Sequence, residues 1–441
     1  MANNEIPQEE IDRREFRRKR RVKNQIISYA VLAIVLIGVI IGGAIGIKKL
    51  ISVVKDKKQA EELQKQLEEL SGMEGEPPIV EAPLEPVDFE EEKDYLGEIV
   101  ESSIAEMPIE DKVAGLFIIT PEALTGADTV TRAGDTTKDK LRERPVGGLI
   151  YFSSNITDAA QLTEMLQNTR GASKYPIFLG IDEEGGTVSR VAEKGLAQNV
   201  GSMSDIGATG DAAAAQEAGV AIGTYLSEYG FNMDFAPVAD VVAEGNTTIG
   251  NRSFGSDPNL VAPMVAAAVE GIQNTGVSAC LKHFPGLGDT TEDTHNGMAT
   301  TEKSLDDFNT FDFPVYQAGI EAGAEFVMVS HLSAPNVTGD NTPASLSNKM
   351  ITEILRGQLG YQGIVITDAM NMTAITDYYT ADEAAVMALQ AGADIILMPE
   401  DFETAYNGVL EAVNNGTITE ERINESLRRI FRVKKKNALD D

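Results

Sequence analysis

Residues 277–297 have the sequence VSACLKHFPGLGDTTEDTHNG, in which an apolar run passes into a loop of charged residues, histidines and glycines. The whole chain has three histidines, and this stretch holds two of them, His283 and His295. Histidine changes charge near neutral pH, and Asp293, two residues before His295, can orient its imidazole. The stretch predicts a short buried strand followed by an acid/base loop, with a polar loop of incidental histidines as the alternative.

The same unit recurs along the chain from about residue 95 onward. Short apolar runs alternate with stretches that mostly have the alanine-rich spacing of helices. The runs are residues 116–120, 147–152, 176–181, 231–235, 277–281, 326–329, 363–367 and 394–398. Eight strands alternating with helices predict an α/β fold, a (β/α)8 TIM-type barrel. A doubly wound open sheet is the alternative, but its GxGxxG fingerprint is absent from the first units.

Polar side chains follow most of these runs, at the strand ends where a barrel enzyme builds its active site. They are Asp182, Asp234, Asp240, Lys282, His283, His331, Asp368 and Glu400. A single aspartate at a strand end can simply cap a loop. Charged or imidazole groups after several strands of one rim instead predict a catalytic site.

The charge of the chain is divided unevenly. Residues 1–58 hold 13 Lys/Arg and 6 Asp/Glu, a net charge of +7. The whole chain has a net charge of −32, so the remaining residues carry a net charge of −39. A domain this acidic repels nucleic-acid phosphate and anionic lipid, which excludes nucleic acid as an expected partner. The single cysteine, Cys280, excludes an intrachain disulfide and is expected to fill a small place in the core.

The basic N-terminal segment, residues 1–24, precedes an uncharged run, residues 25–47. Its 22 apolar-dominated residues, 26–47, reach roughly 33 Å as a helix, enough to span a bilayer core. Eight basic residues precede the run and five follow it, so we expect a single-pass signal-anchor with the N-terminus in the cytoplasm. A cleavable signal peptide usually has a shorter apolar core. Gly38, Gly42 and Gly46 have the spacing of a contact between two such helices, a possible weak homodimer.

Four segments follow from this reading. Residues 1–24 form a basic cytoplasmic tail, 25–47 the membrane span, 48–94 a helical stalk with an acidic proline-rich linker, and 95–441 the barrel. In the stalk, Ala60, Leu63, Leu67 and Leu70 have helical spacing, as a short coiled coil or an ordinary solvated helix. Residues 71–92 contain four prolines and many glutamates, which predicts an extended spacer. The expected location is the cell membrane, with the barrel outside the cytoplasm.

Several motifs of the barrel segment resemble glycoside hydrolase family 3, in particular its β-N-acetylglucosaminidases that act on cell-wall fragments. The resemblance covers nearly all of residues 95–437. Its motifs are LGIDEEGGTVSR (179–190), GFNMDFAPVADV (230–241), IGNRSFGSDP (249–258), LKHFPGLGDTTEDTH (281–295), FVMVSHL (326–332), LGYQGIVITDAMNM (359–372) and AGADIILMP (391–399). They follow the order of the family, each at an expected strand end.

The resemblance implies roles for individual residues. Asp368 corresponds to the nucleophile that attacks the anomeric carbon, and His295 to the acid/base, oriented by Asp293. The residues that match those gripping the hydroxyls of the terminal sugar are Asp182, Arg190, Arg252, Lys282 and His283. No metal or organic cofactor is implied. The chain departs from the family at Leu287, where a second histidine is usual, and at Glu183, where glutamine is usual, which would place another negative charge next to Asp182.

The function expected from this resemblance is removal of terminal β-linked N-acetylglucosamine by a retaining double displacement, which pairs a nucleophile with a proton donor. The expected partner is an N-acetylglucosamine-containing glycan or muropeptide from peptidoglycan. Three alternatives stay open: a β-glucosidase or β-xylosidase, a phosphorolytic variant that uses phosphate in place of water, and a non-catalytic wall-binding protein, for which Leu287 is the hint.

Overall fold

The computed structural model describes residues 94–243, 246–290 and 297–439, which belong to one compact unit, Glu91–Asp441. The expected cytoplasmic tail, the membrane span with Gly38, Gly42 and Gly46, and residues 48–93 of the stalk and linker lie outside the described residues. Within the described part of the chain, no helix is long and apolar enough to cross a membrane.

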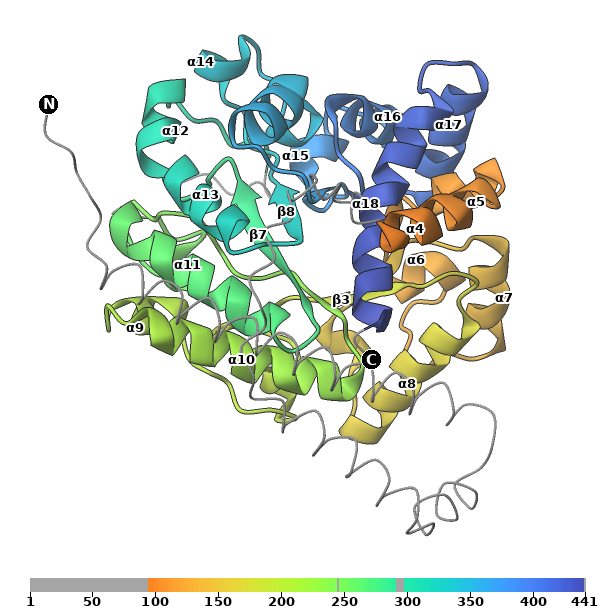
Figure 1. The fold of residues 1–441 in the computed structure, drawn as a ribbon, viewed down its shortest axis with the longest axis horizontal. Helices are drawn as coiled ribbons and strands as arrows, with labels where there is room; N and C mark the ends of the chain where they lie inside the picture. The colour runs from red at the N-terminus through yellow and green to blue at the C-terminus, as the bar shows by residue number, and fades with distance from the viewer. Residues whose placement is uncertain (1–93, 244–245, 291–296, 440–441) are drawn as a thin grey trace, which may run out of the picture. The chain divides into compact units, whose positions relative to one another are not determined.

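The core of this unit is an eight-stranded parallel sheet that curls into a barrel (Figure 1). Its spatial order is β10-β1-β2-β3-β6-β7-β8-β9. The strands are β1 (Phe117–Ile119), β2 (Gly148–Tyr151), β3 (Phe178–Ile181), β6 (Met233–Asp234), β7 (Ser278–Phe284), β8 (Phe326–Val329), β9 (Ile364–Thr367) and β10 (Ile396–Leu397). Seven of the predicted apolar runs contain one of these strands, and the run 277–281 covers the first part of β7. The barrel prediction is therefore confirmed, and the open doubly wound sheet is rejected.

Helices follow the strands and cover the outside of the barrel (Figure 1). They are α4 (Tyr95–Ala105), α5 (Ile109–Ala114), α6 (Pro121–Thr125), α7 (Asp135–Glu143), α8 (Ala159–Ala172), α9 (Met203–Gly207), α10 (Ala212–Tyr229), α11 (Pro258–Gln273), α12 (Leu305–Phe311), α13 (Phe313–Glu321), α14 (Pro335–Thr338), α15 (Thr373–Thr376), α16 (Ala381–Ala391), α17 (Phe402–Asn414) and α18 (Glu420–Leu439). Shorter elements are the hairpin β4 (Glu183–Gly185) and β5 (Val188–Ser189), the 3-10 turns η1 (Ser153–Asn155), η2 (Ala192–Lys194), η3 (Gly250–Arg252) and η5 (Ala344–Leu346), and the π-helix η6 (Lys349–Gln358).

The alanine-rich stretches form helices because their ends carry capping residues. The side chain of Asp211 accepts a hydrogen bond from the Ala213 amide at the start of α10, and Gly230, with φ of 106°, ends that helix. Helices α10 and α11 pack closely through glycines. A Cβ atom on Gly219 would lie 2.7 Å from the Ala268 carbonyl oxygen, so only glycine permits this approach.

The seam between β9 and β10 is where the barrel is least complete. One isolated parallel bridge, Ile366 to Ile395, and a few backbone hydrogen bonds join the two strands. The buried Asp394 reinforces this seam, because its Oδ2 accepts from the Val365 amide at 3.0 Å. The same carboxylate accepts from Arg356 of η6 at 2.6 Å, and from Ser426 and Arg429 of α18 at 2.7 and 3.0 Å. The barrel is nearly closed. At this seam the Asp394 side chain adds hydrogen bonds to the few that the backbones of β9 and β10 make with each other.

The amino-terminal end of the barrel contains a buried cation, Lys434 of α18. Its Nζ donates to the Gly147 carbonyl oxygen at 2.8 Å and lies 4.7 Å from the centre of the Phe178 ring. Burial lowers the pKa of this lysine to about 7. The sequence analysis did not identify this residue.

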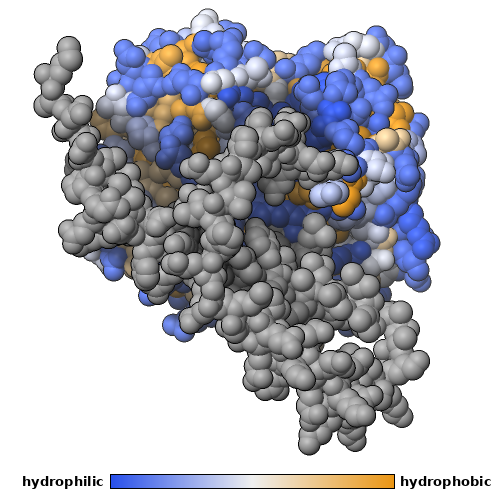
Figure 2. Space-filling model, viewed as in Figure 1, coloured by the Kyte–Doolittle hydropathy of each residue, from blue (hydrophilic) through white to orange (hydrophobic). Residues whose placement is uncertain are grey.

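The outer surface of the described unit is mainly hydrophilic on the face seen in Figure 2, with small separate hydrophobic areas. Few large apolar side chains are exposed; they include Tyr95, Phe311 and Tyr378. Cys280 is fully buried within β7, as expected for a small core residue.

Candidate active site

A cavity of about 450 Å³ lies at the carboxyl ends of the barrel strands. Of the residues assigned roles by resemblance, those in its wall are Asp182, Arg190, Arg252, His283 and Asp368. The apolar residues that line the same cavity come from strand ends and loops: Ile150, Phe152, Val188, Phe235, Ile249, Leu287, Met328, Ala369, Met372, Leu397 and Met398. A wall of this mixed character suits a sugar, which has both hydroxyl groups and apolar ring faces.

Asp368 follows β9 and presents a partly buried carboxylate to the cavity. Its amide donates to the Val329 carbonyl oxygen at 2.8 Å, and its Oδ1 accepts from the Ala369 amide at 2.8 Å. Burial raises the pKa of this carboxyl, but the imidazoles of His331 and His283, with the Ala369 amide, outweigh burial and lower it. Asp368 is therefore ionised at neutral pH, the state that a nucleophile requires.

His331 supports the segment that carries Asp368. It is fully buried after β8, with Nε2 2.9 Å from the Ala369 carbonyl oxygen and Nδ1 2.8 Å from the Ser345 hydroxyl. A carbonyl only accepts, so Nε2 carries a hydrogen and donates it. His331 thus holds the turn after Asp368 in place through Ala369, and it does not line the cavity.

A cluster of two cations and two carboxylates forms one side of the site. Lys282 Nζ lies 2.6 Å from both Asp182 and Glu184. Arg252 of η3 makes a two-point contact with Glu184, with Nε and Nη2 at 2.7 and 2.8 Å from its oxygens. Although burial raises it, the pKa of Glu184 falls to about 2 because Lys282 and Arg252 stabilise the charged form. The cluster holds both cations in place, and of the two Arg252 lines the cavity whereas Lys282 does not.

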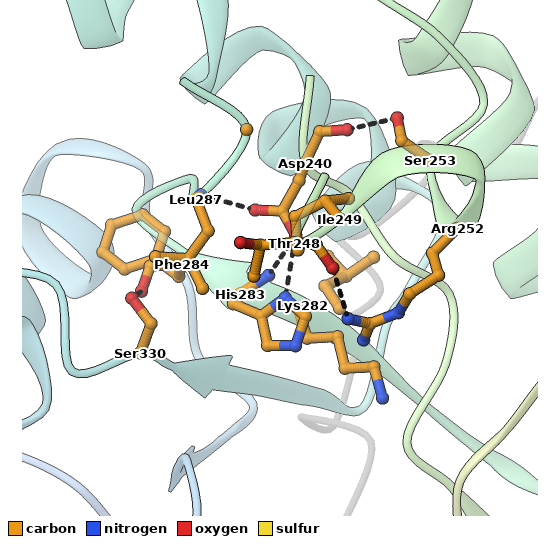
Figure 3. A network of polar contacts seen from close by, with 12 residues as sticks. Asp240, Thr248, Ile249, Arg252, Ser253, Lys282, His283, Phe284, Leu287 and Ser330 are labelled. Carbon is orange, nitrogen blue, oxygen red and sulfur yellow. Dashed lines mark hydrogen bonds and ion pairs between the residues drawn. The ribbon is translucent and has the colours of Figure 1, made fainter. Parts of the chain in front are cut away.

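Asp240 holds His283 and the start of the loop after β7 in place (Figure 3). Its Oδ2 is 2.8 Å from His283 Nδ1, and its Oδ1 accepts from the Leu287 amide at 2.7 Å. Its backbone carbonyl accepts from the Ser253 hydroxyl at 2.6 Å. Because Nδ1 faces a carboxylate, His283 presents its Nε2 edge to the cavity.

Arg190 reaches the cavity from the turn after β5, and its Nε is buried with no hydrogen-bond partner among the described residues. A buried donor without a partner is costly unless a ligand completes it. Arg190 brings a guanidinium group to the cavity wall, although its Nε itself is enclosed by protein.

Asp293 and His295 lie in residues 291–296, outside the described residues, so their geometry and roles stay predictions. The segment that leads to them is well fixed. Asn246 Nδ2 lies 3.1, 3.1 and 2.6 Å from the carbonyl oxygens of Leu287, Gly288 and Thr290. The Leu287 side chain is buried in the cavity wall.

Asp234, Asp240 and Glu400 of the predicted rim, and the adjacent Glu183, do not line the cavity. The buried Glu183 accepts from the Val191 and Ala192 amides and the Tyr225 hydroxyl, so its carboxylate is held by contacts outside the cavity lining. Asp234 accepts from the Glu183 amide at 2.9 Å, and burial raises its pKa well above the usual range. Glu400 is exposed beyond β10.

Several cavity residues were missed by the sequence analysis. Glu184 pairs with both cations of the cluster, Lys282 and Arg252. Its position two residues after Asp182 was the feature of the sequence that could have identified it. Thr248 and Asn371 also line the cavity, without any pattern that distinguishes them in the sequence. Among the described residues, no group of His, Cys, Asp and Glu has the arrangement of a metal site.

Comparison with known proteins places this geometry in a family. Residues 108–433 match the glycosyl hydrolase family 3 N-terminal domain. Beta-hexosaminidase A of Pseudoalteromonas piscicida is 35% identical over 321 residues, 66% of this chain and 53% of that protein. Beta-hexosaminidase of Stenotrophomonas maltophilia (strain R551-3) is 34% identical over 278 residues, 62% of this chain and 82% of that protein.

A solved structure agrees with these matches. The family 3 β-N-acetylglucosaminidase from Paenibacillus sp. str. FPU-7 superimposes with a TM-score of 0.69 and 36% identity, over 76% of this chain and 64% of that one. The chain thus spans about half of the first relative, 82% of the second and about two thirds of this structure. The match over most of the chain, together with an aspartate at the end of the seventh strand of a near-complete barrel, shows that the chain belongs to glycosyl hydrolase family 3.

Proposed function

We propose that this chain is a retaining β-N-acetylglucosaminidase that removes the terminal non-reducing sugar from its substrate. The observation that carries the proposal is the ionised Asp368 carboxylate in a sugar-sized cavity beside Lys282, Arg252 and His283. Relatives named beta-hexosaminidase and a structural neighbour named β-N-acetylglucosaminidase favour the N-acetylated sugar over glucose or xylose.

In the first step, an oxygen of Asp368 attacks the anomeric carbon as the bond to the leaving oxygen breaks. His295, oriented by Asp293, gives its proton to that oxygen. In the second step, His295 takes a proton from water, which attacks the anomeric carbon and releases the sugar and free Asp368. Two displacements on opposite faces retain the anomeric configuration.

The cation cluster fits the task of holding the sugar. Glu184 fixes Arg252 and Lys282, while Asp182 offers a carboxylate whose remaining lone pairs can accept from hydroxyl groups. Arg190 adds a third cation at the site. Groups held in place before binding lose little freedom when the sugar arrives, which favours reaction in the bound geometry.

We further propose peptidoglycan fragments as the substrate and a membrane-anchored, extracytoplasmic enzyme. The support is the uncharged run 25–47, with its excess of basic residues on the N-terminal side, and the acidic proline-rich linker that follows. A cell-wall glycan would be within reach of a barrel held outside the membrane by such a linker.

The test is turnover of aryl glycosides of N-acetylglucosamine, glucose and xylose with the same leaving group. We expect turnover of the N-acetylglucosaminide alone, and loss of many orders of magnitude in Asp368→Ala. Asp377→Ala, at an exposed position after α15, is the matched control and keeps full activity. A slow fluorinated substrate should leave a sugar covalently attached to the peptide that contains Asp368.

The alternatives give different results in the same assay. Preference for the glucoside or xyloside would make the chain a β-glucosidase or β-xylosidase. A sugar 1-phosphate formed in phosphate buffer would identify phosphate as the acceptor. Binding of N-acetylglucosamine without turnover of any glycoside would identify a wall-binding protein. Near-normal kcat in a folded Asp368→Ala protein would reject Asp368 as the nucleophile.

A further inference from the structure

A second cavity, of about 220 Å³, lies at the opposite end of the barrel from the active site. It is formed where β3, β6 and β7 begin, by the residues before these strands and by helices α8, α10 and α18. Its polar side chains are Arg170, Ser227, Asn232, Thr275 and Lys434. None of the described residues that line it is an aspartate or a glutamate.

This absence of carboxylates stands out because the chain as a whole carries a net charge of −32. Two cations therefore face one small cavity, Lys434 from its buried side and Arg170 from its exposed rim. An acidic surface repels anions in general, while a recess with two cations attracts them locally.

Lys434 is only 6% exposed, yet no carboxylate of the described residues forms an ion pair with it. Its ammonium group has three N–H donors, and one of them is used by the Gly147 carbonyl oxygen at 2.8 Å. Its Nζ also lies 4.7 and 5.7 Å from the centres of the Phe178 and Phe431 rings, but no described carboxylate offsets its burial, which lowers its pKa to about 7. An anion in the cavity would supply that offset.

Arg170 can contribute to the same ligand. Its Nη2 donates to the Gly230 carbonyl oxygen at 2.7 Å, which holds the guanidinium at the rim. The group has four further N–H donors, in a planar arrangement that matches two oxygens of a phosphate or carboxylate. Asn232 is occupied with the backbone of Ile177 and Leu179, so it shapes the cavity instead of binding.

We propose that this cavity binds a small oxyanion, a phosphate or carboxylate group, between Lys434 and Arg170. The site is separate from the active site, and it does not rest on the proposed glycosidase function. The volume accommodates inorganic phosphate or a small organic acid, but not a glycan chain of several sugars.

The test is calorimetric titration of the full-length chain at pH 7 with inorganic phosphate, acetate and chloride, in a buffer that contains no other oxyanion. We expect saturable binding of phosphate, acetate or both, with chloride much weaker. Phosphate alone would identify a phosphate-bearing ligand, and acetate alone a carboxylate. Loss of one charge-assisted hydrogen bond should weaken binding by about 10- to 100-fold, in Lys434→Met and in Arg170→Met.

Lys436→Met is the matched control, because Lys436 lies two residues further along α18, is exposed and pairs with Glu325. It should bind the oxyanion as the unchanged chain does. A cooperative unfolding transition, measured by circular dichroism, shows that each variant is folded before it is titrated. If either Lys434→Met or Arg170→Met binds the oxyanion as tightly as the unchanged chain does, the anion lies elsewhere and the proposal is overturned. The absence of saturable binding, or chloride binding as tightly as the oxyanions, overturns it as well.

Discussion

Replacing Lys434 with methionine should stabilise the protein, most strongly below neutral pH. Methionine has a similar length and no charge to bury. The lysine has a pKa of about 7 in the folded chain, against 10.5 when solvated. This difference corresponds to a cost of roughly 5 kcal/mol when the lysine is protonated in both states. The lost hydrogen bond to Gly147 offsets about 1 kcal/mol, so we expect a net gain of about 3 to 4 kcal/mol at pH 6.5.

The pH dependence gives the sharper test. The unfolded chain binds more protons at Lys434 than the folded chain between about pH 7 and 10.5, so the stability of the unchanged protein rises with pH in this window. The destabilisation is complete below about pH 7 and disappears above about pH 10.5. The advantage of Lys434→Met should therefore shrink by about 2 to 3 kcal/mol between pH 6.5 and 9.

Urea unfolding of the full-length chain in a mild detergent, followed by circular dichroism, measures both effects. The buffer must contain no phosphate or carboxylate, because an anion bound beside Lys434 would reduce the free energy that burial of the charged lysine costs. Lys436→Met should unfold like the unchanged chain at every pH. The reasoning fails if Lys434→Met is less stable than the unchanged chain at pH 6.5, or if their difference does not vary with pH.

Three further predictions concern the catalytic loop and the location of the enzyme. His295→Ala should slow substrates with poor leaving groups about 10²–10⁴-fold more than those with activated leaving groups, measured with a series of aryl glycosides; equal losses would contradict an acid/base role. Asn246→Ala removes the donor shared by the carbonyl groups of Leu287, Gly288 and Thr290, and it should lower the free energy of unfolding in urea by about 1–3 kcal/mol. The control Asn259→Ala, at an exposed helix end, should lower it by less. Protease added to intact spheroplasts should release the barrel by cutting within residues 71–92, and protection until lysis would reverse the topology.

The strands could be predicted because a parallel barrel buries both faces of each strand, so each appears as a continuous apolar run. The prediction for β7 ended at Leu281, whereas the strand continues to Phe284. Lys282 and His283 are polar but buried within the strand, because Asp182, Glu184 and Asp240 satisfy them from neighbouring loops. Such compensation depends on contacts that the local sequence does not reveal.

The partners within the site could be predicted only in part. Asp182 and Asp368 follow their strands directly, so the alternation of strands and loops places them on one rim. The contact of Glu184 with Arg252 joins residues 68 positions apart, and neither local sequence indicates it. Without the family resemblance, Arg190 and Arg252 would pass for surface charges.

Lys434 had a signal that the sequence analysis overlooked. Ile423, Leu427, Ile430 and Lys434 recur at spacings of four, three and four, which places the lysine on the buried face of its helix. Its neighbours Lys435 and Lys436 make the segment look like a uniformly solvated basic end. Position on the helix, rather than residue type, decides which of the three is buried.

The seam held by Asp394 has a consequence for the order of assembly. Its partners Ser426 and Arg429 belong to α18, which follows every strand in the sequence. A growing chain that has completed all eight strands still leaves the Asp394 carboxylate without two of its donors until that helix is made. An unpaired buried charge is costly, so the ring of strands should gain its lasting closure only when α18 docks. Helix α18, which is made after all eight strands, thus completes the side-chain contacts that hold β9 and β10 together.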